Sequence, residues 1–421
     1  MQISTLIKLP LVACLVLMLC GCGKDKCRKT VFSKIYTPTL MAVKDYMASF
    51  KAEAPRAIHT TGKIYTKDNY IFVSEPNEGV HIIDNSRPSA PVNIAFIKVL
   101  GNVDVAIKGN ILYADSYSNL VLFNISNPKQ VSFVKQVTNA TAYSVDVNGM
   151  YVGWSPNAKN DTIVVGYTSR DTSYTYDCQI DEHPVCFDNI SVSNAYNSIS
   201  STGRGGSMAR FTIVNNYLYT ANRIKLKSYD ITDATNPVFK NEQTISTGIE
   251  TLFPYGAYLF IGSPSAMHIY DLVHPEAPAQ RAVVTHFRAC DPVVVADNKA
   301  YVTIRGGTTC GGNINQLQVF DVSNVDNPVR LSAVEMKSPF GLGIDNGKLF
   351  ICEGANGLRF LDAGDVNHIT TTRLLAGIDT YDVIPFENQH RLLVSAKDGI
   401  YQYDYQSMNS PQLLSKIAVR N

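Results

Sequence analysis

The sequence predicts an all-β fold, a β-propeller whose four-stranded sheets of about 40 residues are arrayed around a ring. Two observations carry this prediction. An apolar strand pattern that ends in an acid or amide recurs along the chain, and each copy lies between a hairpin-type turn and a proline-bearing turn. The composition agrees, because 23 Tyr, 17 Phe, 27 Gly and 19 Pro in 421 residues are typical of many strands joined by tight turns.

The repeated pattern ends at Asp84, Asn124, Asp230, Asp271, Asp321, Asp362 and Asp404. The steps between these residues are 40, 106, 41, 50, 41 and 42. The second unit contains four strand-like runs, at 103–108, 111–115, 120–125 and 131–137. We expect each terminal acid or amide to cap the turn that follows it, because Asp and Asn side chains bond to backbone two residues on.

The long step between Asn124 and Asp230 is where the number of blades is decided. It contains further apolar runs at 143–147, 151–154 and 162–167, followed by a polar insertion at about 169–206. The sequence therefore favours eight blades, with seven as the alternative. Each unit has its own four runs, so no strand borrowed from the other end of the chain is needed to close the ring.

The turn between the first two runs of a unit has a characteristic composition. It reads Gly109-Asn110, Asn215-Asn216, Asp297-Asn298 and Asn346-Gly347 in four of the units. These residues tolerate the positive φ of two-residue hairpins. In segments 317–328 and 120–128, an apolar strand ends in Asp or Asn and is followed by Ser-Asn and proline. These segments show best the motif by which the chain resembles the LVIVD-repeat family of bacterial propeller proteins over about residues 60–419. This resemblance implies a propeller and brings no known activity with it.

The amino terminus, residues 1–21, is typical of an export signal, with Lys8 before an apolar run. Leu19-Cys20-Gly21-Cys22 resembles a bacterial lipobox, which implies lipidation at Cys22; an ordinary cleaved signal peptide is the alternative. Gly23 after this cysteine favours the outer membrane, with the periplasmic or the surface-exposed face left open.

Residues 22–57 are expected to form a lipid-anchored tether and an amphipathic helix, and residues 58–421 the propeller. The helix is predicted over 39–51, where Leu40, Val43, Met47 and Phe50 recur at steps of three and four.

The remaining cysteines fit an extracytoplasmic protein, in which disulfides form. We expect Cys178 to pair with Cys186 first, and Cys290 with Cys310 second, while Cys352 lies in an apolar run and is expected to be a buried thiol. Cys-x-x-Cys pairs with zinc spacing are missing, so we predict neither a metal nor a cofactor.

The charge balance and the motifs favour a binding module over an enzyme. The formal net charge of +1 argues against nucleic-acid binding, which needs a basic surface. The sequence also lacks a His-Glu-x-x-His motif, a Gly-x-Ser-x-Gly elbow and a Walker loop. We therefore predict a non-catalytic propeller that binds an unidentified protein or glycan, with its membrane contact through the lipid anchor.

Two other functions remain open at this stage. Carboxylates at the channel mouth could serve a carbohydrate-active hydrolase or lyase, and the ring could be a structural part of an envelope assembly. Loops expected at the channel mouth supply the candidate ligand-binding residues, chosen as aromatic, charged or amide side chains. They are Tyr117, Trp154, Arg223, Arg305, Glu353 and Asn356.

Overall fold

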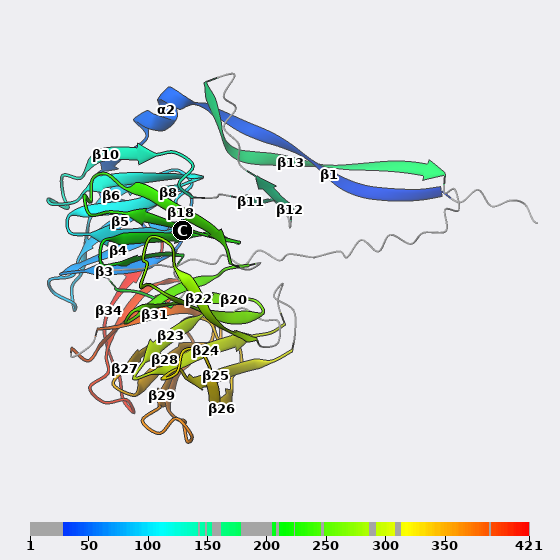
Figure 1. Ribbon diagram of the computed structural model, residues 1–421. Coiled ribbons are helices and arrows are strands. Elements are labelled where there is room, and N and C mark those ends of the chain that lie inside the picture. Colours follow the sequence, from blue (N-terminus) through cyan, green and yellow to red (C-terminus); the bar gives the residue numbers. More distant parts are fainter. Residues whose placement is uncertain are drawn as a thin grey trace, which may run out of the picture. The chain divides into compact units, whose positions relative to one another are not determined.

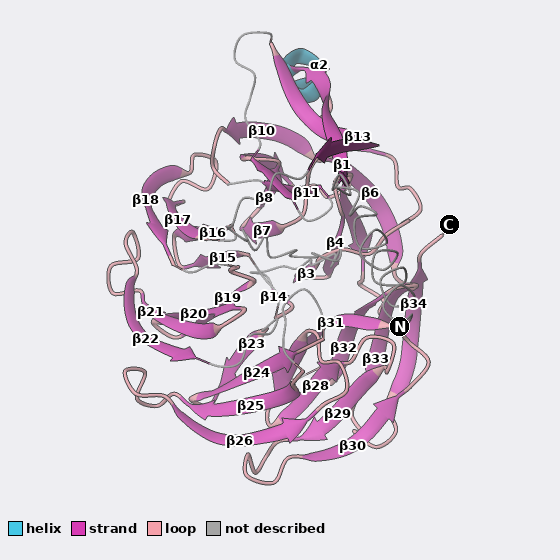
Figure 2. Cartoon of the chain, turned by 90° about the vertical axis from the view of Figure 1, so that its right-hand side faces the viewer, coloured by secondary structure: helices cyan, strands magenta, loops and turns pink. Residues whose placement is uncertain are grey.

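The computed structural model describes residues 28–141, 144–147, 150–153, 161–177, 204–207, 210–222, 224–245, 248–285, 292–307, 313–386 and 389–420. The chain forms two units. One comprises residues 1–39 and 166–189, and the other comprises residues 40–165 and 190–421. The second unit contains the propeller (Figures 1 and 2).

The described residues form seven four-stranded antiparallel blades, and in each blade the strands follow one another in sequence order. The first three blades are β3–β6 (Ile64–Lys67, Tyr70–Glu75, Gly79–Asp84, Val92–Lys98), β7–β10 (Val105–Lys108, Ile111–Ser116, Asn119–Asn124, Ser132–Val137) and β15–β18 (Phe211–Val214, Tyr217–Ala221, Lys225–Asp230, Val238–Thr244). Figure 2 shows the first strand of each blade nearest the centre of the ring and the last strand at the rim.

The other four blades repeat this order. They are β19–β22 (Thr251–Tyr255, Tyr258–Ser263, Ala266–Asp271, Ala279–Thr285), β23–β26 (Val293–Ala296, Lys299–Arg305, Asn315–Asp321, Val329–Glu335), β27–β30 (Leu342–Asp345, Lys348–Cys352, Leu358–Asp362, Thr370–Leu375) and β31–β34 (Thr380–Phe386, Arg391–Ala396, Gly399–Asp404, Gln412–Ala418). The prediction that no strand is borrowed to close the ring is confirmed, because blades 1 and 7 are each continuous in sequence.

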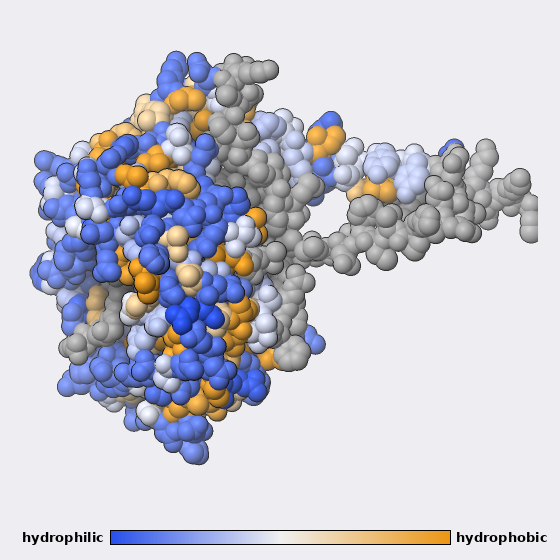
Figure 3. Space-filling view, in the orientation of Figure 1, coloured by the Kyte–Doolittle hydropathy of each residue, from blue (hydrophilic) through white to orange (hydrophobic). Residues whose placement is uncertain are grey.

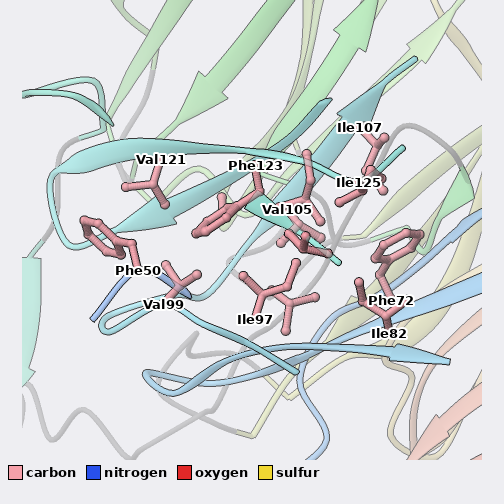
Figure 4. Close-up of a cluster of buried hydrophobic side chains, with 14 of the residues drawn as sticks. Phe50, Phe72, Ile82, Ile97, Val99, Val105, Ile107, Val121, Phe123 and Ile125 are labelled. Atoms are coloured by element: carbon pink, nitrogen blue, oxygen red, sulfur yellow. The ribbon is translucent and has the colours of Figure 1, made fainter. Parts of the chain in front are cut away.

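The hydrophobic core consists of seven clusters, each lying between two consecutive blades. Figure 4 shows the cluster between blades 1 and 2, which contains Phe72 and Ile82 of one blade and Val105 and Phe123 of the other. The cluster of Ile64, Ile71, Ile384 and Leu393 joins blade 7 to blade 1. Each sheet thus buries its apolar faces against its neighbours, which a sheet of this size cannot do alone.

The prediction of eight blades is wrong. Tyr113 and Leu122 of blade 2 pack directly against Phe211 and Leu218 of blade 3, and this contact leaves no place for a blade between them. The runs assigned to an eighth blade form other structures: β11 (Ser144–Val147) and β12 (Met150–Gly153) make a two-stranded sheet, and β13 (Thr162–Asp177) pairs with β1 (Arg28–Ala42).

The helix predicted over 39–51 is not supported at that length. Strand β1 continues to Ala42, the helix α2 covers only Val43–Ala48, and β2 (Lys51–Glu53) pairs with β6 at the outer edge of blade 1. The buried side chains are Tyr46 and Phe50, whereas Leu40 and Val43 are exposed. Among the described residues, no helix has the length and apolar character needed to cross a membrane.

The first unit contains most of the ribbon formed by β1 and β13. Within it, Lys34 donates to Asp171 at 2.6 Å, and the hydroxyls of Thr30 and Thr175 lie 2.9 Å apart. Phe32 is 83% exposed, so this ribbon buries little apolar surface within its own unit. The stretch expected as a tether therefore contains a strand from Arg28 onward.

The surface of the molecule is mostly hydrophilic on the face shown in Figure 3, with apolar residues scattered over it. Many exposed apolar side chains lie on the last strand of a blade, where one sheet edge is at the rim. They are Val92, Phe133, Val134, Val238, Phe239, Val283, Val329 and Leu413.

The local features predicted from the repeat are confirmed. Asn215, Asp297, Asn298 and Asn346 have positive φ in the hairpin turns, as do Gly109 and Gly347. Every terminal acid or amide of the repeat accepts a hydrogen bond through Oδ1 from the backbone N–H two residues later, at 2.7–3.3 Å. The repeat acids are therefore turn caps, and a β-bulge recurs just before them in all seven blades.

Replacing one of these caps should have a small, local effect. Asp404→Ala removes the 2.7 Å hydrogen bond from Gln406 N to Asp404 Oδ1, and we expect a loss of about 1 kcal/mol in the free energy of unfolding. Asp404→Asn keeps an acceptor and should lose less. Urea denaturation of both variants measures the difference; equal losses would mean that the hydrogen bond is not what the residue contributes.

Candidate functional site

One position at the start of the innermost strand is equivalent in all seven blades, and in four of them it holds a charged residue. This residue lies four positions before the last residue of the first strand, where the hairpin to the second strand begins. We call this set the entrance ring. It consists of Lys63, Asp104, Arg210, Thr251, Pro292, Gly341 and Asp382.

Charged members of the entrance ring connect adjacent blades. Lys63 Nζ of blade 1 forms an ion pair with Asp104 Oδ2 of blade 2, and both side chains are at most 1% exposed. The same Asp104 oxygen accepts a hydrogen bond from Arg210 N, 2.9 Å away, at the start of blade 3. Three consecutive blades are thereby joined through a single carboxylate, which has both its charge and its hydrogen bonds satisfied.

A second carboxylate fixes the loop that leads into blade 2. Asp115, at the end of β8, accepts hydrogen bonds through Oδ1 from Val103 N at 2.6 Å, Asp104 N at 2.8 Å and Asn102 Nδ2 at 2.9 Å. This arrangement orients the backbone that leads into Asp104. Asp115 therefore positions the ion pair between blades 1 and 2.

Burial changes the acidity of these groups. Loss of hydration raises the pKa of Asp115 to about 7, against the opposing effect of its hydrogen bonds from backbone amides. Loss of hydration also raises the pKa of Asp382 to about 7, and it lowers the pKa of Lys63 to about 8 although Asp104 favours the charged ammonium. Groups that titrate near neutrality are common in functional sites, and they also occur in structural ion-pair networks.

A short segment of the chain, Arg204–Ser207, which we call the strap, lies against the inner edge of blade 1. Its first two residues form β14 (Arg204–Gly205), which pairs antiparallel with the innermost strand β3. Ser207 Oγ accepts a hydrogen bond from Leu342 N at 2.8 Å and donates one to Asp382 Oδ1 at 3.4 Å. In Figure 2, β14 lies at the centre of the ring.

The raised pKa of Asp382 gives a pH dependence of known sign. An unfolded aspartate has a pKa near 3.9, so between about pH 4 and pH 7 the folded state holds a proton that the unfolded state releases. Stability from this group therefore falls as the pH rises through that window. We expect Asp382→Asn to match wild type near pH 4 and to exceed it at pH 8 by about 4 kcal/mol, measured by urea denaturation. A gain that is the same at both pH values would show that ionisation is not involved.

Of the six residues predicted to bind a ligand, the structure describes four, and these four are divided among three blades. Tyr117 belongs to blade 2, where it is buried with positive φ and donates a hydrogen bond to Val165 O at 3.0 Å. Arg305 of blade 5 is buried, with its guanidinium 3.7 Å from the ring centre of Phe340. Trp154 and Arg223 lie outside the described residues.

Glu353 and Asn356 lie together in one turn of blade 6. Glu353 is fully buried, and its carboxylate accepts hydrogen bonds from Lys337 N at 2.7 Å and Arg359 Nε at 2.8 Å. Asn356, half-buried, donates to Glu353 O at 3.1 Å. Both side chains thus have structural partners, in blade 6 and in the connection that leads into it.

Cys352 is the cysteine that lies within the described residues. Cys352 is a buried free thiol, as expected, and burial raises its pKa. Cys22 and the cysteines of the two expected disulfides, Cys178, Cys186, Cys290 and Cys310, lie outside the described residues. The part of the chain that the structure describes contains no group of three or more His, Cys, Asp or Glu side chains placed to hold a metal ion.

Sequence reasoning missed the entrance ring. Its members do carry a signal, since aligning the units on their hairpin turns brings Lys63, Asp104 and Arg210 to one position. A charged residue just before a buried strand, repeated in three consecutive units, is unusual because Lys, Arg and Asp are rarely buried unless they are paired. The candidate ligand-binding residues were instead chosen from the longer loops, because binding residues are most common in loops.

Comparison with known proteins supports the repeat and the fold. The family model described as LVIVD repeat matches residues 60–96 and 102–139, which are blades 1 and 2. No curated protein matches the chain.

Two solved structures share the architecture. The crystal structure of the computationally designed Ika8 protein has a TM-score of 0.51 at 8% identity, covering 86% of this chain and 88% of the other. A functionally unknown protein from Desulfotomaculum acetoxidans DSM 771 has a TM-score of 0.52 at 10% identity, covering 83% and 96%. At these identities the likeness concerns the fold alone. The chain thus has LVIVD repeats in its first two blades and folds as a seven-bladed β-propeller, which is consistent with an LVIVD-repeat β-propeller family.

Proposed function

We propose that this chain is a lipoprotein of the cell envelope, anchored through Cys22 in the outer membrane, whose propeller is a non-catalytic module that binds a protein or a glycan. The LVIVD-repeat propeller itself carries this proposal, because such a ring is a binding or interaction module. The contacts at the entrance ring support it. Lys63, Asp104 and Asp115 are engaged in holding blades together, which is a structural use of groups that an enzyme would direct at a substrate.

The anchor is tested by changing Cys22. In cells fed an alkyne fatty acid, the wild-type chain should acquire the label and sediment with the outer membrane. Cys22→Ser should lose both properties, while Cys20→Ser, two residues away, should keep them. Label on the Cys22→Ser chain, or an unlabelled wild-type chain, would refute lipidation at this residue.

Binding is tested with the soluble propeller against envelope proteins and a glycan array. We expect capture of a protein or glycan that Trp154→Ala or Arg223→Ala weakens. Lys416→Ala serves as the control, because Lys416 forms an exposed ion pair with Asp398 within blade 7. Binding that neither substitution affects would remove these two residues from the proposed site.

An extracytoplasmic carbohydrate-active hydrolase or lyase is the second candidate function. One observation favours it: Asp115 and Asp382 both have pKa values raised to about 7, the range suited to general acid catalysis near neutral pH. Turnover of any member of a broad glycan panel that is lost in Asp382→Asn would establish this function. A folded, inert wild-type protein on that panel would exclude it for the glycans tested.

A further inference from the structure

The strap occupies a sheet edge that a propeller normally leaves facing its channel. The inner edge of a blade presents a row of backbone N–H and C=O groups along its first strand. Within the described part of the chain, β3 is the only first strand that has a further strand on this side, with Arg204 opposite Thr66 and Gly205 opposite Tyr65. This is the geometry by which an extended peptide adds to a sheet.

The next residue of the strap fits only because it is glycine. A Cβ built on Gly206 would lie 1.4 Å from Asp382 Oδ2 and 2.4 Å from Asp382 Oδ1. Atoms cannot approach so closely, so any other residue would have to move away from the carboxyl group. The entrance of the channel therefore selects a glycine at this point of the bound strand.

Ser207, the residue after this glycine, makes the remaining contacts of the strap. Ser207 bonds to Leu342 of blade 6 and to Asp382 of blade 7, so the strap reaches three blades within four residues. The site thus has three parts: the edge of β3, the backbone N–H of Leu342 and the carboxyl group of Asp382. A hydroxyl group following a glycine satisfies the last two.

The strap leaves one buried acceptor unsatisfied. Asp382 is fully buried, and its Oδ2 has no hydrogen-bond partner among the described residues. An unpaired buried oxygen is costly, since it has lost water without gaining a donor. The strap is held by two paired residues, by the two hydrogen bonds of the Ser207 hydroxyl and by a backbone hydrogen bond from Ser207 to Asp382. Its glycines gain more backbone entropy on release than other residues would.

From these contacts we infer that the strap is a displaceable self-ligand, and that the channel entrance is a binding edge for an extended peptide with glycine opposite Asp382 and a hydroxyl-bearing residue after it. The inference deepens the proposed binding function by naming a peptide as the partner at this site. The chain's own segment keeps the edge closed until a better-fitting strand replaces it.

The experiment uses the strap sequence as its own probe. A labelled, end-capped peptide of residues 202–209, Thr-Gly-Arg-Gly-Gly-Ser-Met-Ala, is titrated into the full chain while fluorescence anisotropy is recorded. Gly206→Ala should expel the strap, raising hydrogen exchange at residues 204–207, and should bind the peptide at least tenfold more tightly than wild type. The matched control is Gly166→Ala, since a Cβ at Gly166 meets nothing within 4 Å.

Two further variants keep the test decisive. The peptide with alanine in place of Gly206 should not bind any of the proteins. If Gly206→Ala does not fold, Ser207→Ala, which removes the hydrogen bond from Leu342 N, should still raise both exchange and peptide binding severalfold. A strap that stays protected in the folded variants, or a released strap whose peptide does not bind in trans, would overturn the inference.

The outcome is separate from that of the proposed function. If the strap peptide fails to bind but an envelope partner is captured by another surface, only this inference falls. If the peptide binds and no envelope partner is found, this inference stands and the proposed envelope partner falls.

Discussion

Lys63→Met is expected to destabilise the propeller by about 3–5 kcal/mol, because it leaves the Asp104 carboxylate buried without its charge partner. The loss should exceed that of an ordinary side-chain truncation, since methionine fills a similar volume and the change is mainly electrostatic. The Asp382 carboxylate also loses a favourable charge in this variant, because the Lys63 ammonium stabilises its ionised form. Urea denaturation at pH 7 measures the loss.

Two controls separate the ion pair from general effects of removing a lysine. Lys416→Met breaks an exposed pair with Asp398 and should cost less than about 1 kcal/mol. Lys63→Met combined with Asp104→Leu removes both charges and should recover part of the loss, although Arg210 N and Val105 N then lose their acceptor. A double variant as unstable as the sum of its two single variants would show that the pair makes no net contribution.

Tyr46→Ala is expected to cost about 3–5 kcal/mol, because this side chain from α2 is fully inserted into the cluster between blades 1 and 2. Its ring contacts Phe50 edge to face, with centroids 4.7 Å apart. Its hydroxyl lies 2.8 Å from Ser116 Oγ and accepts a hydrogen bond from Asn119 Nδ2 at 3.1 Å. Thermal and urea denaturation of the variant give the cost.

Tyr46→Phe is the matched variant, because it keeps the ring and removes only the hydroxyl. We expect about 1–3 kcal/mol, the cost of leaving the Ser116 and Asn119 side chains without this partner. A Tyr46→Ala protein as stable as wild type would mean that the segment before blade 1 is not part of the core. That result would contradict the packing described above.

The features predicted correctly from the sequence are those that depend on neighbours in the chain. The cap at Asp321 reaches Ser323, only two residues away, and the turn at Asn346 and Gly347 depends on the φ of those two residues. The strand runs also follow from local alternation and short length. The ring follows from the repetition of these units, because each small sheet must bury both of its apolar faces against neighbouring sheets.

The errors concern which strand pairs with which. The run at 162–167 has the composition of a blade strand, but it belongs to β13 and pairs with β1, more than 100 residues earlier. The helix expected at 39–51 has helical periodicity, yet its first residues gain backbone hydrogen bonds in β1, and a helix of this length is marginal in water. The pattern of residues within a segment does not show which distant strand that segment will pair with.

The entrance ring was missed for a related reason. Asp382 meets Gly206 and Ser207 from a segment about 175 residues away, and Lys63 meets Asp104 from the next blade. The sequence contains each residue but not the distance between them. By contrast, the caps of the repeat were found because both partners lie in one turn.

The contact between the first and last blades has a consequence for how such proteins change in evolution. Ile58 and Val419 form a parallel bridge, and Arg420 N donates to Ile58 O at 2.8 Å, so the two ends of the ring meet side by side without exchanging a strand. Every blade is therefore encoded by one uninterrupted stretch of gene. Duplication or loss of such a stretch adds or removes a whole blade, and a circularly permuted gene cut at any hairpin should still encode the ring.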